Sequence, residues 1–392
     1  MSNNWLLPEF IADILPSEAR RLEKLRRALL DCFHSYGYEL VMPPLLEYID
    51  SLLTGSGHDL DLRTFKLVDE LSGRTMGLRA DITPQIARID AHLLNRSGIT
   101  RLCYAGSVLH TWPAGFYATR EPLQIGAEIY GYAGIDADLE IQHLLVSALR
   151  LANLQKMHLD FCHTGVLDAL LDQVRIEDAP KTMLYEALLA KDVTMIKDVA
   201  QSFPVDVRHA LLALVGLYGE PAEVLPAARR ILPDLPPIHL ALAQLEKLAT
   251  AAVQQDVHVA LDLADLRGYQ YHTGFMFSAY IADVPNAVAR GGRYDKIGRA
   301  FGRARPATGF SLDLREVAAI SSLDVRDAII LAPYTSHQTV RLAEKIAQLR
   351  AAGGVVIQIF PEQPFDFDGN QTVRMLEWLD GEWVLIPFRS LK

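Results

Sequence analysis

Gln124, Gly126 and Glu128 alternate with apolar residues in segment 123–130, which has the composition of a β-strand. On a strand these three positions share one face, which would present an amide and a carboxylate on either side of a gap. Such a pair suits a ligand that carries an ammonium group or an N–H donor. The alternative is that this face is solvated and that Gln124 and Glu128 are ordinary surface residues.

A second polar segment spans residues 267–274 (Arg-Gly-Tyr-Gln-Tyr-His-Thr-Gly). An arginine beside a glycine can bring its guanidinium group to a bound carboxylate or phosphate, although an arginine in a surface turn fits equally well. Residues 291–295 (Gly-Gly-Arg-Tyr-Asp) could form a phosphate-cradling turn, but a double glycine more often marks a sharp bend. His110 and His272 have no second His or Cys at ligand spacing, so neither a metal site nor a cofactor is expected.

Several helices and strands must position these residues. Leu22, Leu25, Leu29 and Phe33 recur at helical spacing, and Thr83-Pro84 opens a helix that is expected to run to about Ser97-Gly98. Ser72-Gly73 predicts a hairpin between two short strands. The other expected elements are strands 101–109, 123–130 and 156–162 and a helix over 136–154.

The composition changes between residue 164 and about residue 255. Ala and Leu dominate there, strand patterns are absent and prolines separate several expected helices. Strand patterns resume at 257–262 and 274–280, and 329–359 has a β-α-β pattern. The sequence therefore predicts an α+β fold, with a mainly antiparallel sheet flanked by helices. We expect a core of residues 1–163 and 256–320, a helical insertion at 164–255 and a small α/β domain at 321–392.

Composition limits the function. The chain has 392 residues, 38 of them Lys or Arg and 48 Asp or Glu, for a net charge of −10. This acidic balance makes a nucleic-acid partner unfavoured, because phosphate backbones usually bind basic surfaces. Neither a bilayer-spanning apolar run nor a signal peptide is expected, and the three scattered cysteines fit a reducing compartment, so a cytoplasmic protein without membrane association is predicted.

The order of these segments resembles the core of histidyl-tRNA synthetases, which are class II synthetases. The resemblance covers about residues 8–318. It runs through 13–16 (Asp-Ile-Leu-Pro), 42–44 (Met-Pro-Pro, the dimer-forming motif) and 78–83 (Leu-Arg-Ala-Asp-Ile-Thr). It continues through 267–274 and through 291–295, which match the family's Gly-Gly-Arg-Tyr-Asp unchanged.

The resemblance implies a histidine-binding pocket. Asp81 and Thr83 match contacts to the α-amino group, and Gln124 and Glu128 match positions that hold the amino group and the imidazole. Arg267 matches the arginine near the carboxylate. The residues that flank the side chain would be Tyr271 and His272, where the family has two tyrosines.

Two departures imply that the ATP site is degenerate. His110 stands where the family's second motif has an ATP-binding arginine, and Glu316 stands where the third motif has the arginine that grips the triphosphate. Amino-acid activation requires cations at these phosphates, so synthetase activity is predicted to be lost. The segment 322–392 is also shorter than the synthetase anticodon domain, and its acidic residues outnumber its basic ones.

This combination resembles the regulatory subunit of ATP phosphoribosyltransferase, a synthetase-like paralogue used in histidine biosynthesis. The resemblance implies a non-catalytic protein that forms dimers, assembles with the short-form catalytic subunit and takes part in feedback inhibition by histidine. Two alternatives remain open: a divergent histidyl-tRNA synthetase, which would activate histidine and bind tRNA, and a stand-alone amino-acid-sensing module.

Overall fold

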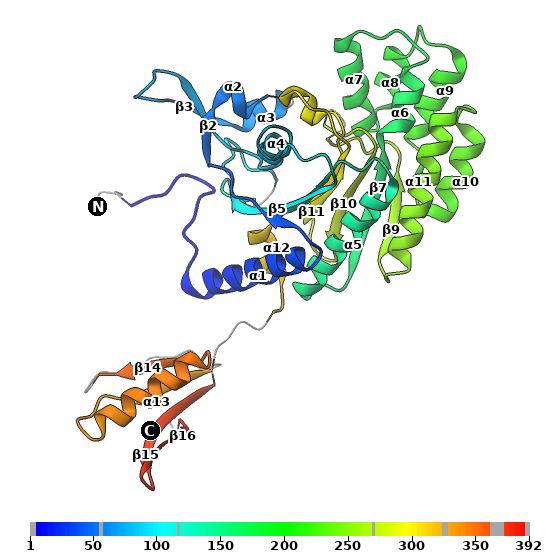
Figure 1. The fold of residues 1–392 in the computed structure, drawn as a ribbon. Coiled ribbons are helices and arrows are strands. Elements are labelled where there is room, and N and C mark those ends of the chain that lie inside the picture. Colours follow the sequence, from blue (N-terminus) through cyan, green and yellow to red (C-terminus); the bar gives the residue numbers. More distant parts are fainter. Residues whose placement is uncertain are drawn as a thin grey trace. The chain divides into compact units, whose positions relative to one another are not determined.

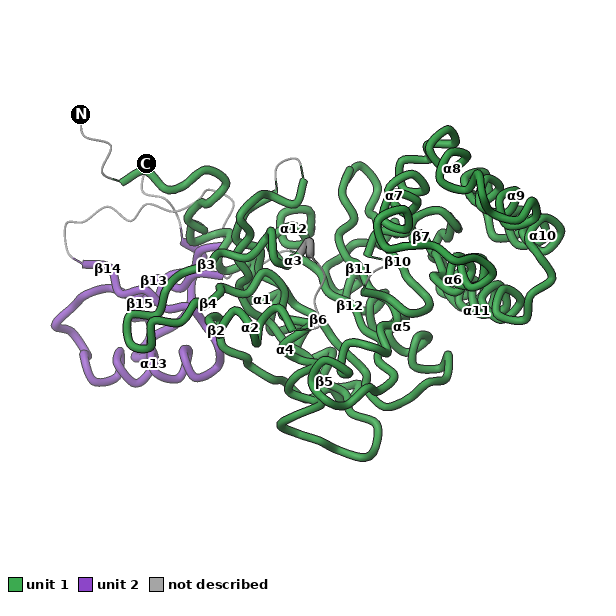
Figure 2. Tube along the Cα trace, turned by 90° about the horizontal axis from the view of Figure 1, so that it is seen from above, with its two compact units in different colours: residues 1–323 green, residues 324–392 purple. Residues whose placement is uncertain are grey.

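The computed structural model describes residues 5–54, 58–115, 118–268, 271–323, 328–360 and 372–388. The chain divides into two compact units, residues 1–323 and residues 324–392, which Figure 2 draws in green and purple. Each unit encloses its own cluster of buried apolar side chains.

A nine-stranded sheet forms the centre of the first unit, in the order β1-β5-β6-β12-β11-β10-β7-β9-β8. Neighbours from β5 to β7 are antiparallel, whereas β1 pairs with β5 and β7 pairs with β9 in parallel. In sheet order the strands are β1 (Glu39–Leu40), β5 (Thr100–Ser107), β6 (Leu123–Tyr130), β12 (Ala307–Asp313), β11 (Ala289–Arg293), β10 (Phe275–Ile281), β7 (Met157–His163), β9 (His258–Asp262) and β8 (Tyr218–Gly219). The predicted α+β class is confirmed, with antiparallel pairing through the middle of the sheet.

Helix α1 (Pro16–Ser35) packs against α5 (Ile135–Leu151) and α12 (Leu314–Ile320), and all three helices lie against this sheet (Figure 1). The buried face of α1 is the one predicted from helical spacing, and it consists of Leu22, Leu25, Leu29 and Phe33. The Phe33 ring meets the Phe310 ring of β12 edge to face, with centroids 5.8 Å apart. The apolar face of α1 therefore packs against β12, one of the strands that carry the site.

The helix that begins at Thr83 is shorter than predicted. Helix α4 (Thr83–Arg88) continues as the π-helical segment η1 (Ile89–Leu94), and Asn95 ends it in the left-handed conformation with φ +46°. Asn tolerates this conformation, so the helix ends at Asn95, before the predicted end at Ser97-Gly98. The short helix η2 (Ile297–Phe301) packs against α4 and η1.

The hairpin predicted around Ser72-Gly73 is confirmed. Strands β3 (Phe65–Val68) and β4 (Thr75–Leu78) pair antiparallel, and β2 (Leu46–Tyr48) adds to β4. Helices α2 (Ile49–Leu52) and α3 (His58–Arg63) connect β2 to β3. This small sheet leads directly into residues 79–83, which reach the site.

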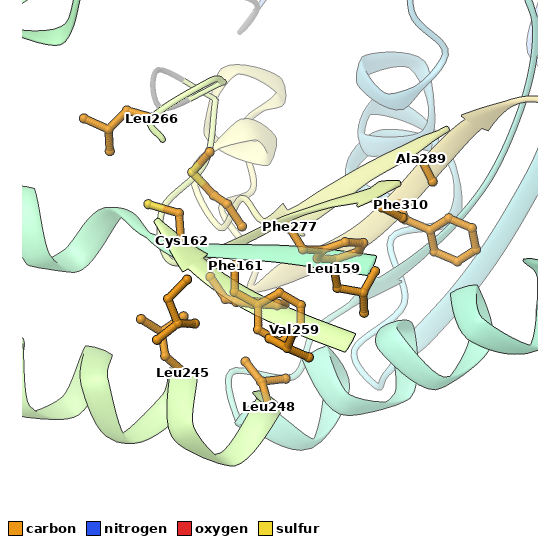
Figure 3. Close-up of a cluster of buried hydrophobic side chains, with 14 of the residues drawn as sticks. Leu159, Phe161, Cys162, Leu245, Leu248, Val259, Leu266, Phe277, Ala289 and Phe310 are labelled. Carbon is orange, nitrogen blue, oxygen red and sulfur yellow. The ribbon is translucent and has the colours of Figure 1, made fainter. Parts of the chain in front are cut away.

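A helical layer connects β7 to β9. Its helices are α6 (Thr164–Leu171), α7 (Asp178–Leu189), α8 (Val193–Val199), α9 (Val205–Leu214), α10 (Pro221–Ile231) and α11 (Pro236–Val253). Strand β8, which pairs with β9, was missed because two residues are too short to show alternation. Leu245 and Leu248 of α11 pack towards Leu159 and Phe161 of β7, as Figure 3 shows.

The second unit holds the predicted β-α-β pattern as β13 (Ile329–Pro333), α13 (Thr339–Ala351) and β14 (Val355–Ile359). It also holds a hairpin that was not predicted, β15 (Val373–Leu379) and β16 (Glu382–Pro387). Its turn residues, Asp380 and Gly381, both have positive φ, and an Asp-Gly pair is a strong hairpin signal. Among the described residues of the whole chain, every helix is too short or too polar to cross a bilayer.

Candidate functional site

A cavity of about 390 Å³ lies in the first unit where β6, β11 and β12 face the residues that follow β4. Six of the seven residues that the synthetase resemblance assigns to a histidine pocket line it: Asp81, Thr83, Gln124, Glu128, Tyr271 and His272. They come from three separate parts of the chain, so the fold brings together side chains that the sequence leaves far apart.

Asp81 and Gln124 form one side of the cavity and fix each other. The Gln124 amide donates from Nε2 to Asp81 Oδ1 at 2.7 Å and accepts from the Ile82 backbone N–H at 2.8 Å. Asp81 Oδ1 also accepts from the Thr83 backbone N–H at 3.1 Å. The hydrogen bonds that the described residues make to Asp81 all use Oδ1, so Oδ2 offers an acceptor for a ligand ammonium group.

Glu128 forms the floor of the cavity and is only 1% exposed. The hydroxyl groups of Tyr104 and Tyr294 donate to its two carboxylate oxygens, Tyr104 at 3.1 Å from Oε1. Burial raises the pKa of Glu128 to about 8, because the charged form loses its hydration. The solvated-surface interpretation of Glu128 is therefore wrong.

Glycines make room for this floor. A Cβ atom at Gly309 would lie 1.5 Å from Glu128 Oε2, and one at Gly126 would lie 2.5 Å from both the Phe310 carbonyl and the Tyr104 hydroxyl. The gap predicted between Gln124 and Glu128 is thus a requirement of packing, because the Tyr104 side chain and the Phe310 carbonyl take the space that a side chain at Gly126 would fill.

Tyr271 and His272 form an aromatic wall. The Tyr271 ring lies 5.1 Å from the Tyr294 ring, centroid to centroid, and the Tyr271 hydroxyl is buried without a hydrogen-bond partner among the described residues. His272 Nδ1 donates to the Gly268 carbonyl at 2.9 Å, and burial lowers the pKa of His272. An orphaned buried hydroxyl is costly unless a ligand or a water satisfies it.

The seventh expected residue, Arg267, does not line this cavity. Its guanidinium group pairs with Asp265, with Nε donating to Oδ1 at 2.7 Å, and also donates to the Tyr280 hydroxyl at 3.2 Å. It borders a neighbouring cavity of about 590 Å³. The difference from the expectation arises because Asp265, two residues away, already satisfies the charge.

His110 and Glu316, the two departures from the synthetase motifs, share another cavity, of about 210 Å³. Asp313 lines it as well and accepts hydrogen bonds from the Leu123 and Arg315 backbone N–H groups. Burial raises the pKa of Glu316 and that of Asp313, the latter to about 7. Arg290 is the one arginine among the described lining residues of this cavity, and the two acidic side chains beside it oppose the binding of a triphosphate.

His110 is buried and neutral. Its Nε2 donates to the Ala80 carbonyl at 2.9 Å, which leaves Nδ1 to accept from Arg63 Nη2 at 3.1 Å. Burial and the Arg63 charge lower the pKa of His110 to about 4. Arg63 therefore brings a cation to a position where His110 itself supplies none.

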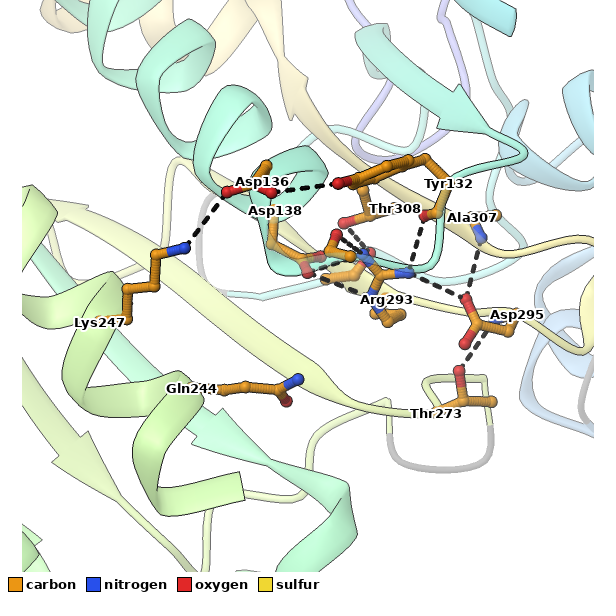
Figure 4. A network of polar contacts seen from close by, with 12 residues as sticks. Tyr132, Asp136, Asp138, Gln244, Lys247, Thr273, Arg293, Asp295, Ala307 and Thr308 are labelled. Atoms are coloured by element: carbon orange, nitrogen blue, oxygen red, sulfur yellow. Dashed lines mark hydrogen bonds and ion pairs between the residues drawn. The ribbon is translucent and has the colours of Figure 1, made fainter. Parts of the chain in front are cut away.

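The Gly-Gly-Arg-Tyr-Asp segment is not a phosphate-cradling turn. It begins inside strand β11, and Arg293 forms a buried ion pair with Asp138 at 2.7 Å while donating to the Gly134 carbonyl at 3.0 Å (Figure 4). Asp295 accepts from the Ala307 N–H at 2.9 Å. The motif thus ties the sheet to α5, and Gly291 and Tyr294 are its residues that line the cavity.

Four residues that line the site or complete its hydrogen bonds were not singled out from the sequence: Arg63, Tyr104, Arg290 and Tyr294. Tyr294 lies within a quoted motif, and Tyr104 follows the alternation of its strand, so both carried a usable signal. Within the described parts of the chain, the His, Cys, Asp and Glu side chains form no group of three or more that could hold a metal ion.

The fold and the cavity define a protein of the histidyl-tRNA synthetase class. A family model described as "Histidyl-tRNA synthetase" matches residues 10–317, and the chain belongs to this family. A solved histidyl-tRNA synthetase from Nostoc sp. PCC 7120 has the same fold, with a TM-score of 0.74 over 92% of this chain and 87% of that one at 19% identity.

Within that class the chain belongs to the ATP phosphoribosyltransferase regulatory subunits. Proteins of that name from Ralstonia pickettii and Cupriavidus pinatubonensis are 61% and 60% identical to it, over 99% of this chain and 99% and 100% of theirs. A model described as "ATP phosphoribosyltransferase subunit HisZ C-terminal domain" matches residues 327–386. A structure from Bacillus halodurans, titled regulatory subunit/histidyl-tRNA synthetase, is 25% identical with a TM-score of 0.80 and covers 93% of this chain and 94% of that one.

Proposed function

We propose that this regulatory subunit binds histidine in the cavity around Glu128 and assembles with the short-form catalytic subunit of ATP phosphoribosyltransferase. Bound histidine would be the end-product signal that inhibits phosphoribosyl transfer. Coupling between two such sites is typically about 1–3 kcal/mol, which shifts an affinity by about 5- to 150-fold.

The observation that carries the proposal is the contrast between two cavities. The larger one keeps acceptors for an ammonium group and a ring N–H in Asp81 and Glu128, and an unpartnered hydroxyl on Tyr271. The smaller one holds Asp313 and Glu316, two acids where phosphates would need cations, with Arg290 as the one arginine among its described lining residues. Amino-acid binding is therefore supported, and ATP-dependent activation is not.

The proposal also covers the oligomeric state, the cellular location and the absence of a nucleic-acid partner. We expect a dimer through residues 42–44, where Met42 is exposed, a cytoplasmic location and no nucleic-acid partner. The acidic balance of the chain supports the last expectation, since tRNA binding draws on basic surfaces.

The test mixes the full chain with its catalytic subunit, assays phosphoribosyl transfer and titrates L-histidine. Asp81→Asn should raise the half-inhibitory histidine concentration about tenfold, because a charged hydrogen bond to the ammonium group is lost, and should leave activation without histidine unchanged. Glu186→Gln, on the exposed part of α7, is the matched acid-to-amide control and should change neither value.

Two results would overturn the proposal. Without saturable histidine binding by this subunit or by the assembled complex, the protein would act as an activator and scaffold only. Histidine-dependent ATP–pyrophosphate exchange at ordinary synthetase rates would instead establish the divergent synthetase.

A further inference from the structure

We propose that Arg290, and not Arg267, is the cation that receives the carboxylate of the amino acid bound in this cavity. The inference rests on the proposed function and names a residue that decides which ligands the site accepts. It follows from the positions of the Arg63, Arg267 and Arg290 guanidinium groups and from which of them already bind another side chain.

Arg267 is occupied. Its Nε and Nη2 atoms donate to the two oxygens of Asp265, the two-pronged geometry in which a guanidinium group binds a carboxylate most strongly, and Nη2 also reaches the Tyr280 hydroxyl. A ligand carboxylate would have to displace Asp265, which is itself mostly buried. Arg267 is also outside the lining of the cavity that holds Asp81 and Glu128.

Arg290 is available. It lines the 390 Å³ cavity and both neighbouring cavities, and no described residue forms a hydrogen bond or an ion pair with its guanidinium group. Its positive charge acts on Glu316 and lowers the pKa of that carboxyl group, although burial raises this pKa more strongly. Arg63, the other cation in the lining, already donates to His110.

The strand register points Arg290 towards the ligand. Arg290 of β11 lies opposite Ser311 of β12, and Ser311 lies opposite Gly126 of β6. Residues directly opposite one another share a face of the sheet, so Arg290 lies on the face that carries Gln124 and Glu128. Two strand spacings, about 10 Å, separate the β11 and β6 backbones, and the β12 residue between them, Ser311, is small and lines the cavity.

The cavity is therefore polarised across β12. Asp81 and Glu128 supply negative charge or acceptors from the β6 side, and Arg290 supplies positive charge from the β11 side, with Arg63 adding to its potential. A zwitterionic amino acid with a basic ring fits this arrangement when its carboxylate faces β11 and its ammonium group and ring face Asp81 and Glu128. A compound with the same ammonium group and ring but no carboxylate would lose the contact with Arg290.

The test is calorimetric titration of the full chain with L-histidine and with L-histidinol, whose alcohol replaces the carboxylate. The wild-type protein should bind L-histidine at least about tenfold more tightly, as a charge-assisted contact implies. Arg290→Gln should weaken L-histidine about 10- to 100-fold and leave L-histidinol unchanged. Arg290→Lys should give an intermediate loss for L-histidine alone, and Arg267→Gln should leave the preference for L-histidine intact.

Thermal unfolding of each variant shows whether it is folded, and Arg290→Lys carries the test if Arg290→Gln is not. The inference is overturned if Arg290→Gln and Arg290→Lys bind L-histidine as tightly as the wild type does. It is also overturned if Arg267→Gln weakens L-histidine but not L-histidinol. In both cases the proposed function stands. No binding of L-histidine by the wild-type protein, alone or assembled with its catalytic subunit, overturns both. Equal losses for L-histidine and L-histidinol in the Arg290 variants refute a carboxylate contact.

Discussion

Replacing Glu128 with Gln should change how the stability of the first unit depends on pH. The pKa of Glu128 is about 8 in the folded protein against an ordinary value of 4.5, because its carboxyl group is buried. Between these two pH values the native state holds one proton more than the unfolded chain, so stability falls as the pH rises. The slope is about 1.4 kcal/mol per pH unit, and the loss from about pH 5.5 to about pH 7.5 is about 2.7 kcal/mol.

In Glu128→Gln this contribution disappears, because the amide does not titrate over the same range. The Tyr104 hydroxyl can still donate to the amide oxygen, and near pH 5 the two proteins should have similar free energies of unfolding. At about pH 7.5 the variant should be more stable than the wild type by about 2–3 kcal/mol.

Hydrogen exchange of the β6 amides, corrected for the intrinsic pH dependence of exchange, measures the unfolding free energy of the first unit alone. Glu140→Gln is the matched control. The Arg101 guanidinium beside Glu140 lowers the pKa of that carboxyl group, so Glu140 stays ionised over this pH range and its variant should run parallel to the wild type. Wild-type and Glu128→Gln curves that run parallel would refute the assignment of a protonated, buried Glu128.

Three further predictions concern neighbouring residues. Asp138→Asn should destabilise the first unit by about 3 kcal/mol, measured by urea unfolding, because it removes the nearer carboxylate from the buried Arg293 and leaves Asp295 at 3.4 Å as its ion-pair partner. Gly309→Ala should lower the melting temperature and cost about 3 kcal/mol, since its methyl group would overlap the Glu128 carboxylate; a melting temperature equal to the wild type would contradict the close approach. Tyr271→Phe should leave unfolding unchanged within about 1 kcal/mol, as its hydroxyl has no described partner, yet should weaken histidine about tenfold in calorimetry.

Local patterns predicted much of the scaffold. The apolar spacing in α1, the alternation in β6 and the turn residues between β3 and β4 each require only nearby residues, and each element is confirmed. The end of the helix that begins at Thr83 and the two-residue strand β8 were not predictable in this way. The first depends on a π-helical turn, and the second exists only because β9 lies beside it.

The candidate site shows the same division. Alternation placed Gln124, Gly126 and Glu128 on one face, but only the position of β6 between β5 and β12 buries Glu128. The sequence also could not show that Arg267 turns to Asp265, or that Arg63 reaches His110 across 47 positions of the chain. Each of these contacts is decided by tertiary packing rather than by residue type.

The parallel pairing of β7 with β9 has a consequence for how this family can vary in length. A parallel neighbour cannot be reached by a tight turn, so the chain that leaves β7 must travel back along the sheet before β9 begins, and this return needs a dozen or more residues. The helices that make the return share one continuous apolar cluster with the sheet. Deletions in evolution or in the laboratory could shorten this return path. Removing it entirely would also remove β8 and would prevent β9 from pairing in parallel with β7.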